Sequence, residues 1–349
     1  MAEQRKKTYT VRFEPVGVEM EVEEGEIVLN AAFRQGIMLM HGCKEGQCSS
    51  CKSILMEGDI ELLKYSTFAL PDYERGQDYV LLCRTEAHSD LVVELLNYDE
   101  ELLLTSIPVK EYGATISAIE SLTHDIRRLE VQVAQPLQFR AGQYVDITIP
   151  GKGVTRSFSM ANPPSQQKTL EFIIKLYPDG AFSSLLQDHL QVGDQLELKG
   201  PYGTCFRRED PSGLMILVGG GSGMAPLWSI LNDFVERGDR GRPVVFFYGA
   251  RAERDLFYLD KIAAISEQLP NFRFVPALSH LDADAVWDGE KGFIHEVINR
   301  YFQEAVQKSE MEAYSCGPPP MIDAVVPVLE GNRVKPDHIH VDKFTQAVH

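Results

Sequence analysis

Four cysteines share a spacing that could hold a metal cluster. Cys43, Cys48 and Cys51 lie in the segment CKEGQCSSC, and Cys83 follows farther along the chain in YVLLCRTEA. The pattern C-x4-C-x2-C with a distant fourth cysteine is typical of a plant-type [2Fe–2S] cluster. Structural zinc is the alternative, although zinc ribbons usually present two paired C-x2-C knuckles and Cys83 stands alone. The spacing therefore predicts an iron–sulfur site ligated by these four thiolates.

The cysteine loop also contains the small residues that a tight path around a cluster requires. Gly42 and Gly46 accept a positive φ without a Cβ clash. Ser49 and Ser50 are small enough to leave backbone N–H groups free to point at the sulfurs. Such hydrogen bonds help to set the reduction potential, which is about −400 mV for this cluster type.

A second group of residues could bind a flavin. In RSFS (156–159), Arg156 can pair with a pyrophosphate, Phe158 offers a flat face, and Ser159 could hydrogen-bond the reactive edge of an isoalloxazine. The segment GAFS (180–183) opens a predicted helix, whose first amides form an anion site. Taken alone, an Arg-Ser run is often a solvated strand end. The nucleotide-type segment that follows favours the flavin interpretation.

A third group could bind a nicotinamide dinucleotide. In ILVGGGSGMAP (216–226) a strand runs into a glycine-rich turn and a helix, with Pro226 in the first helical turn. In YSCGPPPM (314–321), Cys316 lies at the tip of a predicted strand, where ligands of open α/β sheets bind. A buried, inert thiol is the alternative, and we adopt it for Cys205.

The segment YGARAERDLFY (248–258) would meet the adenosine half of that dinucleotide. Glu253 and Asp255 could bind a ribose 2′-hydroxyl, whereas Arg251 and Arg254 could bind a 2′-phosphate. We favour NADH over NADPH, although these residues do not decide between them. The nine histidines have no catalytic or metal spacing, and His338 and His340 are interpreted as ordinary surface residues.

Three types of predicted element must position these groups. Alternation over 8–30 predicts two strands, and a short helix follows over 27–37. Residues 51–62 are predicted as one strand, and residues 79–96 as two strands that include Cys83. Small sheet, single helix and long ligand loop together make a first domain.

The rest of the chain divides at two changes of pattern. Residues 105–113 resemble a linker, and short alternating strands then continue to about residue 208, which argues for an antiparallel barrel. One helix interrupts them at 180–190. After residue 212 buried strands alternate with helices, including one over 292–306, as in a doubly wound parallel sheet.

Composition excludes several classes of protein. The formal net charge of −17 disfavours nucleic acid binding. Residues 1–105 carry 20 acidic and 10 basic side chains, which indicates either a solubilising surface or a docking face for a basic partner. Residues 214–231 are uncharged, but four glycines and a proline favour a strand–turn–helix over a membrane span. The N-terminal segment lacks an apolar signal core, so we expect a cytoplasmic protein.

The order of these motifs resembles that of the flavin–iron–sulfur reductase components of bacterial multicomponent oxygenases. It is most similar to the reductases of soluble di-iron monooxygenases of the methane, propane, phenol and toluene type. The resemblance covers essentially the whole chain through CKEGQCSSC, YVLLCRT, RSFSMAN, GGGSGMAP, LFYLD, CGPPPMID and VDKF. Two positions depart from the family pattern: Phe158 replaces a usual Tyr of the flavin motif, and Ser222 replaces a usual Thr.

The resemblance implies three domains and their cofactors. These are a β-grasp ferredoxin-like domain with the cluster (1–105), a six-stranded antiparallel β-barrel with FAD (108–208), and a doubly wound parallel-sheet domain with NADH (212–349). It also implies that Cys316 lies near the nicotinamide C4 and that Phe344 covers the flavin ring. Ser159 and Cys316 are the expected catalytic residues. The expected cofactor-binding set is Arg156, Ser157, Phe158, Ser159, Ile173, Lys175, Gly180, Ala181, Phe182, Ser183, Phe344, Gly220, Gly221, Ser222, Gly223, Ala225, Pro226, Gly249, Arg251, Cys316, Gly317, Pro318 and Pro319.

The predicted activity is that of an NADH:acceptor oxidoreductase. NADH gives a hydride, and a [2Fe–2S] cluster accepts one electron at a time, so a flavin is needed to convert between them. The expected partner is the di-iron hydroxylase of a monooxygenase, with a small regulatory protein, and the isolated chain is expected to be monomeric. The nearest alternative is the reductase of a Rieske-type ring-hydroxylating dioxygenase. A redox-sensing carrier without turnover and a zinc-stabilised scaffold are the other two.

Overall fold

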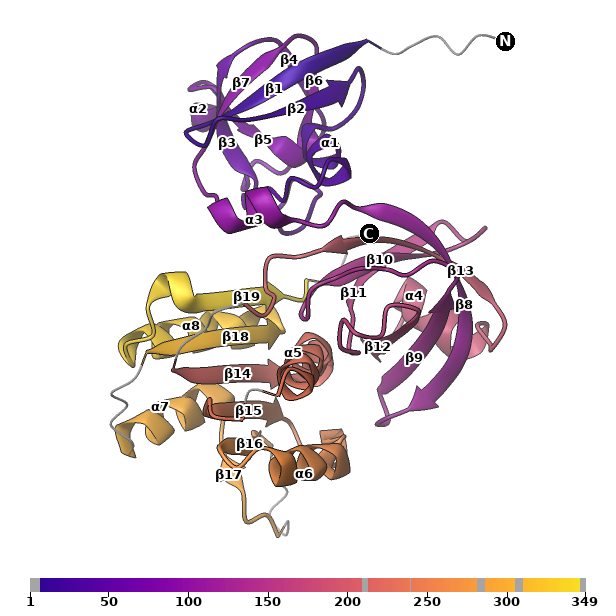
Figure 1. The fold of residues 1–349 in the computed structure, drawn as a ribbon, viewed down its shortest axis with the longest axis vertical. Helices are drawn as coiled ribbons and strands as arrows, with labels where there is room; N and C mark the ends of the chain where they lie inside the picture. Colours follow the sequence, from indigo (N-terminus) through magenta and orange to yellow (C-terminus); the bar gives the residue numbers. More distant parts are fainter. Residues whose placement is uncertain (1–6, 209–212, 239, 281–285, 305–309, 346–349) are drawn as a thin grey trace. The chain divides into compact units, whose positions relative to one another are not determined.

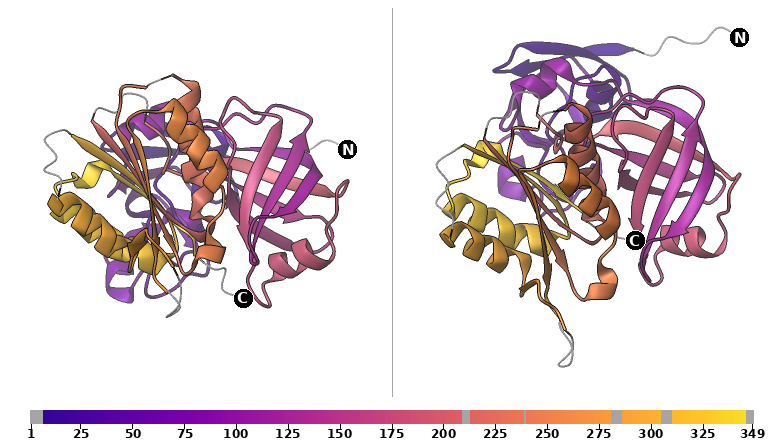
Figure 2. Two further views of the ribbon diagram at one scale, coloured as in Figure 1. Left: turned by 90° about the horizontal axis from the view of Figure 1, so that it is seen from below. Right: turned by 60° about the horizontal axis from the view of Figure 1, so that its bottom comes forward.

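A computed structural model describes residues 7–208, 213–238, 240–280, 286–304 and 310–345 of the chain. The chain divides into two compact units, residues 1–110 and 111–349. Figures 1 and 2 show the unit that contains the cysteine loop in indigo to purple, and the larger unit in magenta to yellow. The outermost residues of the predicted domains, at 1–6, 212 and 346–349, and the end of the helix predicted over 292–306 lie outside the described residues.

The first unit is a small mixed sheet covered by one helix. Its five strands follow the order β2-β1-β7-β3-β5, with β1 and β2 forming an antiparallel hairpin and β1 pairing in parallel with β7. Helix α1 (Val28–Arg34) buries Val28, Leu29, Ala31, Ala32 and Phe33. The strands are β1 (Thr8–Glu14), β2 (Val18–Glu23), β3 (Lys52–Glu57), β5 (Tyr79–Leu81) and β7 (Leu91–Leu95). The predicted β-grasp class is confirmed.

Two local predictions in this unit are wrong. Residues 51–62 form two strands, β3 and β4 (Ile60–Leu62), because Gly58 turns the chain with a φ of +108°. Strand β4 pairs with β6 (Thr85–Ala87) in a separate two-stranded sheet. Cys83 lies in a single 3₁₀ turn, η1 (Leu82–Arg84), rather than in a strand. The turn bends the chain and brings this sulfur to the cysteine loop.

The connection to the second unit is short and packed. Helices α2 (Asp72–Arg75) and α3 (Glu100–Thr105) were not predicted, and α3 ends where a linker was expected to begin. Only residues 106–109 separate α3 from β8. The amide of Val109 donates to the carbonyl of Phe33 at 3.0 Å, and Pro108 lies against Gly36. This segment therefore belongs structurally to the first unit.

The second unit begins with an antiparallel barrel. Six strands follow the order β11-β10-β13-β8-β9-β12, and a bridge between Met160 and Phe172 brings the two end strands together. Alternate side chains fill the interior, as the period-2 pattern predicts. The elements are β8 (Lys110–Ser121), β9 (Ile126–Val133), β10 (Tyr144–Ile149), β11 (Val154–Ser159), β12 (Thr169–Lys175), α4 (Ala181–Asp188) and β13 (Gln195–Tyr202).

A parallel sheet of six strands completes the second unit. Its order is β17-β16-β15-β14-β18-β19, with α5 and α6 packed on one face and α7 and α8 on the other (Figures 1 and 2). The strands are β14 (Leu214–Gly220), β15 (Val244–Ala250), β16 (Phe272–Leu278), β17 (Glu290–Lys291), β18 (Met311–Gly317) and β19 (Ile339–Lys343). The helices are α5 (Met224–Glu236), α6 (Leu259–Gln268), α7 (Ile294–Glu304) and α8 (Pro319–Gly331).

The strand order locates the ligand-binding edge of this sheet. From β14 the chain adds strands in one direction, and it then crosses to β18 and β19 on the other side. Doubly wound sheets bind their ligands at such a switch point, at the carboxyl ends of the strands. Here that point lies between Gly219 and Cys316, which are register partners. Residues 214–231 form strand, turn and helix, and no helix in the described part of the chain is long and apolar enough to cross a bilayer.

Candidate functional site

The cysteine loop wraps its backbone around the sulfurs. The amides of Glu45 and Gln47 donate to Cys43 Sγ at 3.4 and 3.2 Å, and the Cys43 amide donates to Cys48 Sγ at 3.3 Å. Ser50 places its hydroxyl 3.3 Å from the sulfur of Cys48. Backbone N–H groups turned toward sulfur favour the thiolate form, so this loop is built for negatively charged sulfur.

The four sulfurs form two pairs. Cys43 contacts Cys48, and Cys51 contacts Cys83. The hydrogen bond from the Cys43 thiol lowers the pKa of Cys48 to about 4, and the same bond raises the pKa of Cys43. Cys83 acts likewise on Cys51, whose pKa is lowered while that of Cys83 is raised. Within each pair, one sulfur is thus favoured as a thiolate and the other as a thiol. A cation bound between the sulfurs would favour loss of the remaining proton.

These residues fit a [2Fe–2S] cluster. Each iron of such a cluster takes two thiolates, which matches the two sulfur pairs. A Cβ on Gly42 would lie 3.0 Å from Cys48 Sγ, so a side chain there would press on this sulfur. Gly46 has a φ of +71°, and its Cβ would lie 2.8 Å from the Cβ of Tyr65. Gly46 therefore has the expected positive φ at a position where only glycine fits, whereas Gly42 does not have a positive φ.

The neighbouring segment supports the loop and exposes an aromatic ring. Ser66 donates its amide to the carbonyl of Gly46 at 3.0 Å, and the Ser49 hydroxyl donates to the carbonyl of Ala69 at 2.9 Å. Between these two contacts the side chain of Phe68 is 95% exposed. The ring of Phe68 therefore remains in solvent beside the cysteine loop.

The residues predicted to hold the flavin lie on β11 and at the start of α4. Arg156 is half-buried and donates to the Thr155 carbonyl at 2.7 Å, so its guanidinium remains near the backbone of β11. The rings of Phe158 and Phe182 pack at 4.7 Å, which brings helix α4 against β11. Ser157 is exposed and donates to the carboxylate of Asp146 at 2.6 Å.

The start of α4 offers its amides but not all of its side chains. Phe182 is buried in the barrel core, so only its backbone can face a ligand. The Ser183 hydroxyl accepts the amide of Tyr177 at 3.0 Å, which fixes the turn that precedes the helix. Gly180 precedes the helix without a side-chain cap, and Ala181 is its first residue. The uncapped amides suit an anion such as a pyrophosphate.

Three residues from three elements meet where the barrel adjoins the parallel sheet. The Ser159 hydroxyl on β11 donates to the carboxylate of Asp342 on β19. Asp342 is the register partner of Cys316 on β18, and its amide donates to the Cys316 sulfur. The two predicted catalytic residues are therefore joined through a residue that was not predicted, although its motif VDKF was recognised.

The protonation states at this junction follow from burial. Burial raises the pKa of Asp342 to about 6, and the hydrogen bond from Ser159 lowers it in part. Cys316 is fully buried, which raises its pKa well above the usual value and keeps the thiol neutral. Ser159 and the Cys316 thiol thus offer neutral hydrogen-bonding groups, and Asp342 is a carboxyl group that can hold a proton near neutrality.

Cys205 was interpreted as inert, and the structure places it in contact with the same junction. Its Sγ lies 3.7 Å from Cys316 Sγ, and both side chains are buried. Cys205 belongs to the barrel half of this unit and Cys316 to the parallel sheet. Because the two residues lie 111 positions apart, no local sequence pattern reveals the contact.

The glycine-rich turn packs directly on the tip of β18. A Cβ on Gly223 would lie 2.7 Å from the carbonyl carbon of Cys316 and 3.0 Å from Gly317 Cα. Gly221 has a φ of +57° and open space around it, and its carbonyl accepts the Tyr248 hydroxyl at 2.9 Å. Tyr248 was not predicted as a site residue, although it begins the recognised segment 248–258.

Other predicted residues line the same edge of the sheet. Gly220 and Gly249 are register partners at the ends of β14 and β15. Pro318 precedes α8, and Pro319 is its first residue. The Phe344 amide donates to the carbonyl of Gly317 at 2.9 Å. Ser222, Ala225 and Pro226 follow in the turn and the first turn of α5, and Ile173 packs in the apolar cluster shared by barrel and sheet.

Two basic side chains that were predicted to bind cofactors, Lys175 and Arg251, form ion pairs with carboxylates. Lys175 forms an ion pair with Asp125, and the Asp125 carboxylate also lies 3.0 Å from Arg251. Arg251 also contacts Asp255 at 3.1 Å. Asp255 was expected to face a ribose, but its carboxylate turns back to Arg251 and to the Ala252 amide. This network crosses from the barrel to the parallel sheet.

One prediction about a histidine is wrong. The side chain of His340 is only 11% exposed and lies 3.3 Å from Glu312, so it is not an ordinary surface residue.

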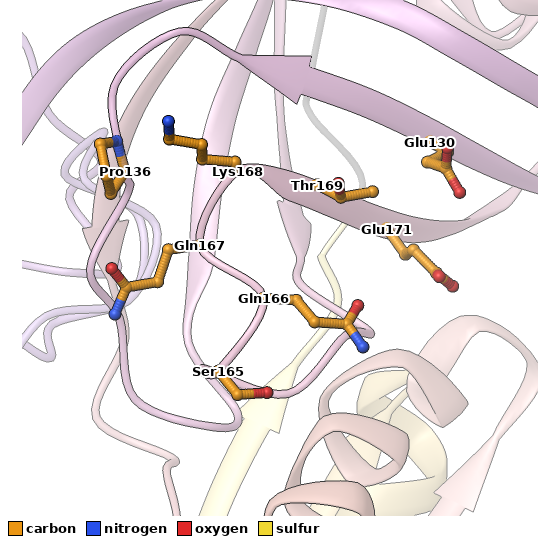
Figure 3. Close-up of a pocket in the computed structure, with 8 residues that line it drawn as sticks. All are labelled: Glu130, Pro136, Ser165, Gln166, Gln167, Lys168, Thr169 and Glu171. Atoms are coloured by element: carbon orange, nitrogen blue, oxygen red, sulfur yellow. The ribbon is translucent and has the colours of Figure 1, made fainter.

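A pocket of about 540 Å³ opens on the barrel beside β12 (Figure 3). Its lining residues are Glu130, Pro136, Ser165, Gln166, Gln167, Lys168, Thr169 and Glu171, none of which was predicted to bind a cofactor.

Three protein families match successive parts of the chain. Residues 11–88 match the 2Fe-2S iron-sulfur cluster binding domain, residues 113–206 the oxidoreductase FAD-binding domain, and residues 217–327 the oxidoreductase NAD-binding domain. The predictions of a [2Fe–2S] cluster, FAD and NAD are thereby confirmed. The same match favours the cluster over structural zinc.

Whole-chain relatives cover the same span. The reductase component of propane 2-monooxygenase from Mycolicibacterium goodii is 45% identical over 98% of both chains. The solved cytochrome P450 reductase of Amycolatopsis has a TM-score of 0.87 at 31% identity, covering 97% of this chain and 99% of that one. The ferredoxin reductase in carbazole 1,9a-dioxygenase has a TM-score of 0.78 at 31% identity, covering 98% and 100%.

Proposed function

Because the chain belongs to the reductase components of bacterial soluble di-iron monooxygenases, we propose that it carries electrons from NADH through FAD and a [2Fe–2S] cluster to a hydroxylase. The chain is an oxidoreductase, and its family implies a hydroxylase partner. The observation that carries the route is the meeting of Ser159, Asp342 and Cys316, which joins a FAD-family barrel to an NAD-family sheet.

We assign the residues of the junction as follows. Ser159, which is held by Asp342, would orient the flavin edge. The neutral thiol of Cys316 would line the nicotinamide position without adding a charge there. Gly221, which has open space around it, would leave room for the dinucleotide backbone, whereas Gly223 lets the turn pack on the backbone of Cys316. Arg156 and the start of α4 would hold the flavin pyrophosphate.

The bound groups supply the redox chemistry, with FAD accepting a hydride and the cluster accepting single electrons. The chain supplies position and protonation. Asp342, with a pKa of about 6, can take or return a proton through the Ser159 hydroxyl. The amides that point at Cys43 and Cys48 stabilise negative charge on the cluster sulfurs. The two proposed sites lie in different compact units.

Anaerobic titration with NADH tests the whole route. We expect flavin absorbance and cluster absorbance to be lost together, complete at about 1.5 NADH per chain, because a flavin takes two electrons and a cluster takes one. Absorption spectroscopy of the purified chain, with iron and acid-labile sulfide analysis, measures this.

Three outcomes would contradict the proposal. Flavin bleaching with an unchanged cluster spectrum would remove the cluster from the route. A chain that leaves NADH unoxidised would instead favour a redox-sensing carrier, and a colourless chain would favour a zinc scaffold. Steady NADH-dependent reduction of ferricyanide excludes both of those alternatives.

The partner proposal concerns the surface beside the cysteine loop. We propose that the hydroxylase docks over the exposed ring of Phe68, within the acidic first unit. An exposed aromatic ring can act as the apolar centre of an interface, and surrounding charge increases the association rate. The partner surface would therefore be basic around an apolar recess.

Replacing Phe68 by Ala should lower electron transfer to the hydroxylase by about tenfold, because the central side chain of the interface is lost. Stopped-flow reduction of the hydroxylase by the pre-reduced reductase measures this. Met56→Ala, which removes a 56% exposed side chain of the same unit, is the matched control and should have little effect. Rates that are equal for both variants and insensitive to added salt would contradict this docking surface.

Structural similarity to a dioxygenase reductase keeps one alternative partner class open to a direct test. The purified chain should reduce a di-iron hydroxylase faster than a Rieske-type dioxygenase when both are offered at equal concentration. A reversed preference would favour the dioxygenase alternative. The 45% identity to the propane 2-monooxygenase reductase component supports the first assignment.

The remaining parts of the proposal concern organisation. We propose domains at 1–105, 108–208 and 212–349, a monomeric chain when isolated, and a small regulatory protein as a further partner. A cytoplasmic setting is proposed because NADH is supplied there and thiols stay reduced there. Light scattering of the purified chain tests the monomer.

A further inference from the structure

We propose that Asp125 is a specificity-determining residue that selects NADH over NADPH by holding Arg251 away from a 2′-phosphate. This inference deepens the proposed function, since it concerns the nucleotide of the same site. Asp125 lies in the turn between β8 and β9 of the barrel, whereas Arg251 follows β15 of the parallel sheet. The residue that sets the choice thus comes from the domain that does not bind the nucleotide.

The position of Arg251 makes it the natural ligand for a 2′-phosphate. It is the first residue after β15, whose end pairs with the glycine-rich end of β14 through Gly249 and Gly220. In doubly wound nucleotide domains the pyrophosphate lies on the glycine-rich turn, and the ribose 2′-position is read at the tip of the next strand. An arginine at that tip accommodates a 2′-phosphate, and a carboxylate there binds a 2′-hydroxyl.

Arg251 is held by two carboxylates in the structure. Its Nη2 donates to Asp125 at 3.0 Å and to Asp255 at 3.2 Å, and its Nε donates to Asp255 at 3.1 Å. The hydrogen bonds to Asp255 and then to Asp125 raise the pKa of Arg251. Although burial raises the pKa of Asp125, its contacts with Lys175, Thr123 and His124 hold it below the usual value. Asp125 is therefore charged at neutral pH.

Asp125 also neutralises the second cation of this region. Lys175 on β12 forms an ion pair with the same carboxylate. Two positive groups, Lys175 and Arg251, are thus balanced by Asp125 and Asp255, and the local charge is near zero. A 2′-hydroxyl is neutral and tolerates this arrangement. A 2′-phosphate carries about two negative charges and would have to compete with both carboxylates for Arg251.

The group formed by His124, Asp125 and Asp255 is not interpreted as a metal site. Ligand atoms of His124, Asp125 and Asp255 lie within 4.8 Å of one another. Both carboxylates already have cationic partners, however, and His124 lies 3.3 Å from Asp125 and 3.6 Å from Asp255. A divalent ion would have to displace Lys175 and Arg251. Discrimination between a 2′-hydroxyl and a 2′-phosphate requires neither ion pair to be broken by a metal.

Asp125→Asn tests the inference with little change in shape. We expect the ratio of kcat/KM for NADH to kcat/KM for NADPH to fall about tenfold, through a lower KM for NADPH, because only one of the two carboxylates that compete with phosphate for Arg251 remains. The assay is ferricyanide reduction by the FAD-loaded, cluster-loaded chain. Binding of 2′,5′-ADP, measured by calorimetry, should tighten by a similar factor relative to 5′-AMP.

Two further variants make the test decisive. In Asp125→Asn/Arg251→Gln the gain in affinity for NADPH and for 2′,5′-ADP should disappear, because the guanidinium that would bind the phosphate is absent. Glu120→Gln removes an exposed carboxylate that pairs with Arg128 on the same barrel, and it should leave the ratio unchanged. An unchanged ratio in Asp125→Asn, or a gain that survives loss of Arg251, overturns the inference.

Failure of the proposed function would look different. In that case the wild-type chain would be reduced by neither nucleotide. Failure of the present inference leaves reduction by NADH intact and the NADH-to-NADPH ratio of the Asp125→Asn variant within about twofold of wild type. The calorimetric comparison of 2′,5′-ADP with 5′-AMP requires no electron transfer, so it tests the ribose site independently.

Discussion

Replacing Cys51 by Ala should lower electron delivery to the hydroxylase by more than about 100-fold while NADH-dependent ferricyanide reduction continues. Cys51 is 6% exposed and is paired with Cys83, so its loss leaves one sulfur of that pair without its companion. The exposed Cys48 is a poorer target, because water or the Ser50 hydroxyl could replace its sulfur. The junction residues Ser159, Asp342 and Cys316 lie in the other compact unit.

Three measurements check this expectation. Iron analysis and the visible spectrum report the cluster, stopped-flow reduction of the hydroxylase reports delivery, and ferricyanide turnover reports the flavin half. Thr67→Ala, an exposed change beside the cysteine loop, is the control and should retain the iron. Full iron content together with an undiminished rate of electron transfer to the hydroxylase in Cys51→Ala would contradict the assignment of this residue as a ligand.

Adding one methyl group at Gly223 should slow hydride transfer from NADH by about 100-fold. The new Cβ would overlap the backbone of Cys316, so the start of α5 and the tip of β18 must move apart. Overpacking of this kind also costs about 1–3 kcal/mol of stability. A misplacement of about 1 Å at the reacting groups is enough for a rate loss of this size.

Stopped-flow bleaching of the flavin by NADH measures the effect of Gly223→Ala. FAD content should be retained, because the flavin residues on β11 and α4 lie outside the overlap. Gly241→Ala is the matched control in the same domain, since its Cβ meets no atom within 4 Å. Hydride transfer at the wild-type rate in Gly223→Ala would mean that the turn does not position the nicotinamide.

The sequence was most informative where chemistry or periodicity is local. The spacing of Cys43, Cys48 and Cys51 predicted the cluster, and the change from period-2 strands to alternating strands and helices predicted the fold classes, which are confirmed. A cluster loop must supply several ligands from a short segment. Its ligands therefore stay close together in the sequence, where a pattern can be read.

The sequence did not reveal contacts between distant residues, and it did not reveal short elements. Asp125 and Arg251 are 126 residues apart, and Cys205 and Cys316 are 111 apart, so their contacts have no sequence pattern. Helix α2 has four residues, too few for a helical periodicity to develop. His340 is covered because β19 lies against β18, where Tyr314 packs on its ring at 5.0 Å.

The packed segment 106–109 decides where this chain can be divided for separate expression of its halves. The Val109 amide donates a hydrogen bond to the Phe33 carbonyl, and Pro108 lies against Gly36. A fragment that stopped after helix α3 would therefore lose these contacts at the C-terminal end of α1. A cut placed after Lys110 keeps those contacts, but it removes the first residue of β8 from the other fragment. Fragment boundaries should therefore overlap at this residue, with both fragments containing it.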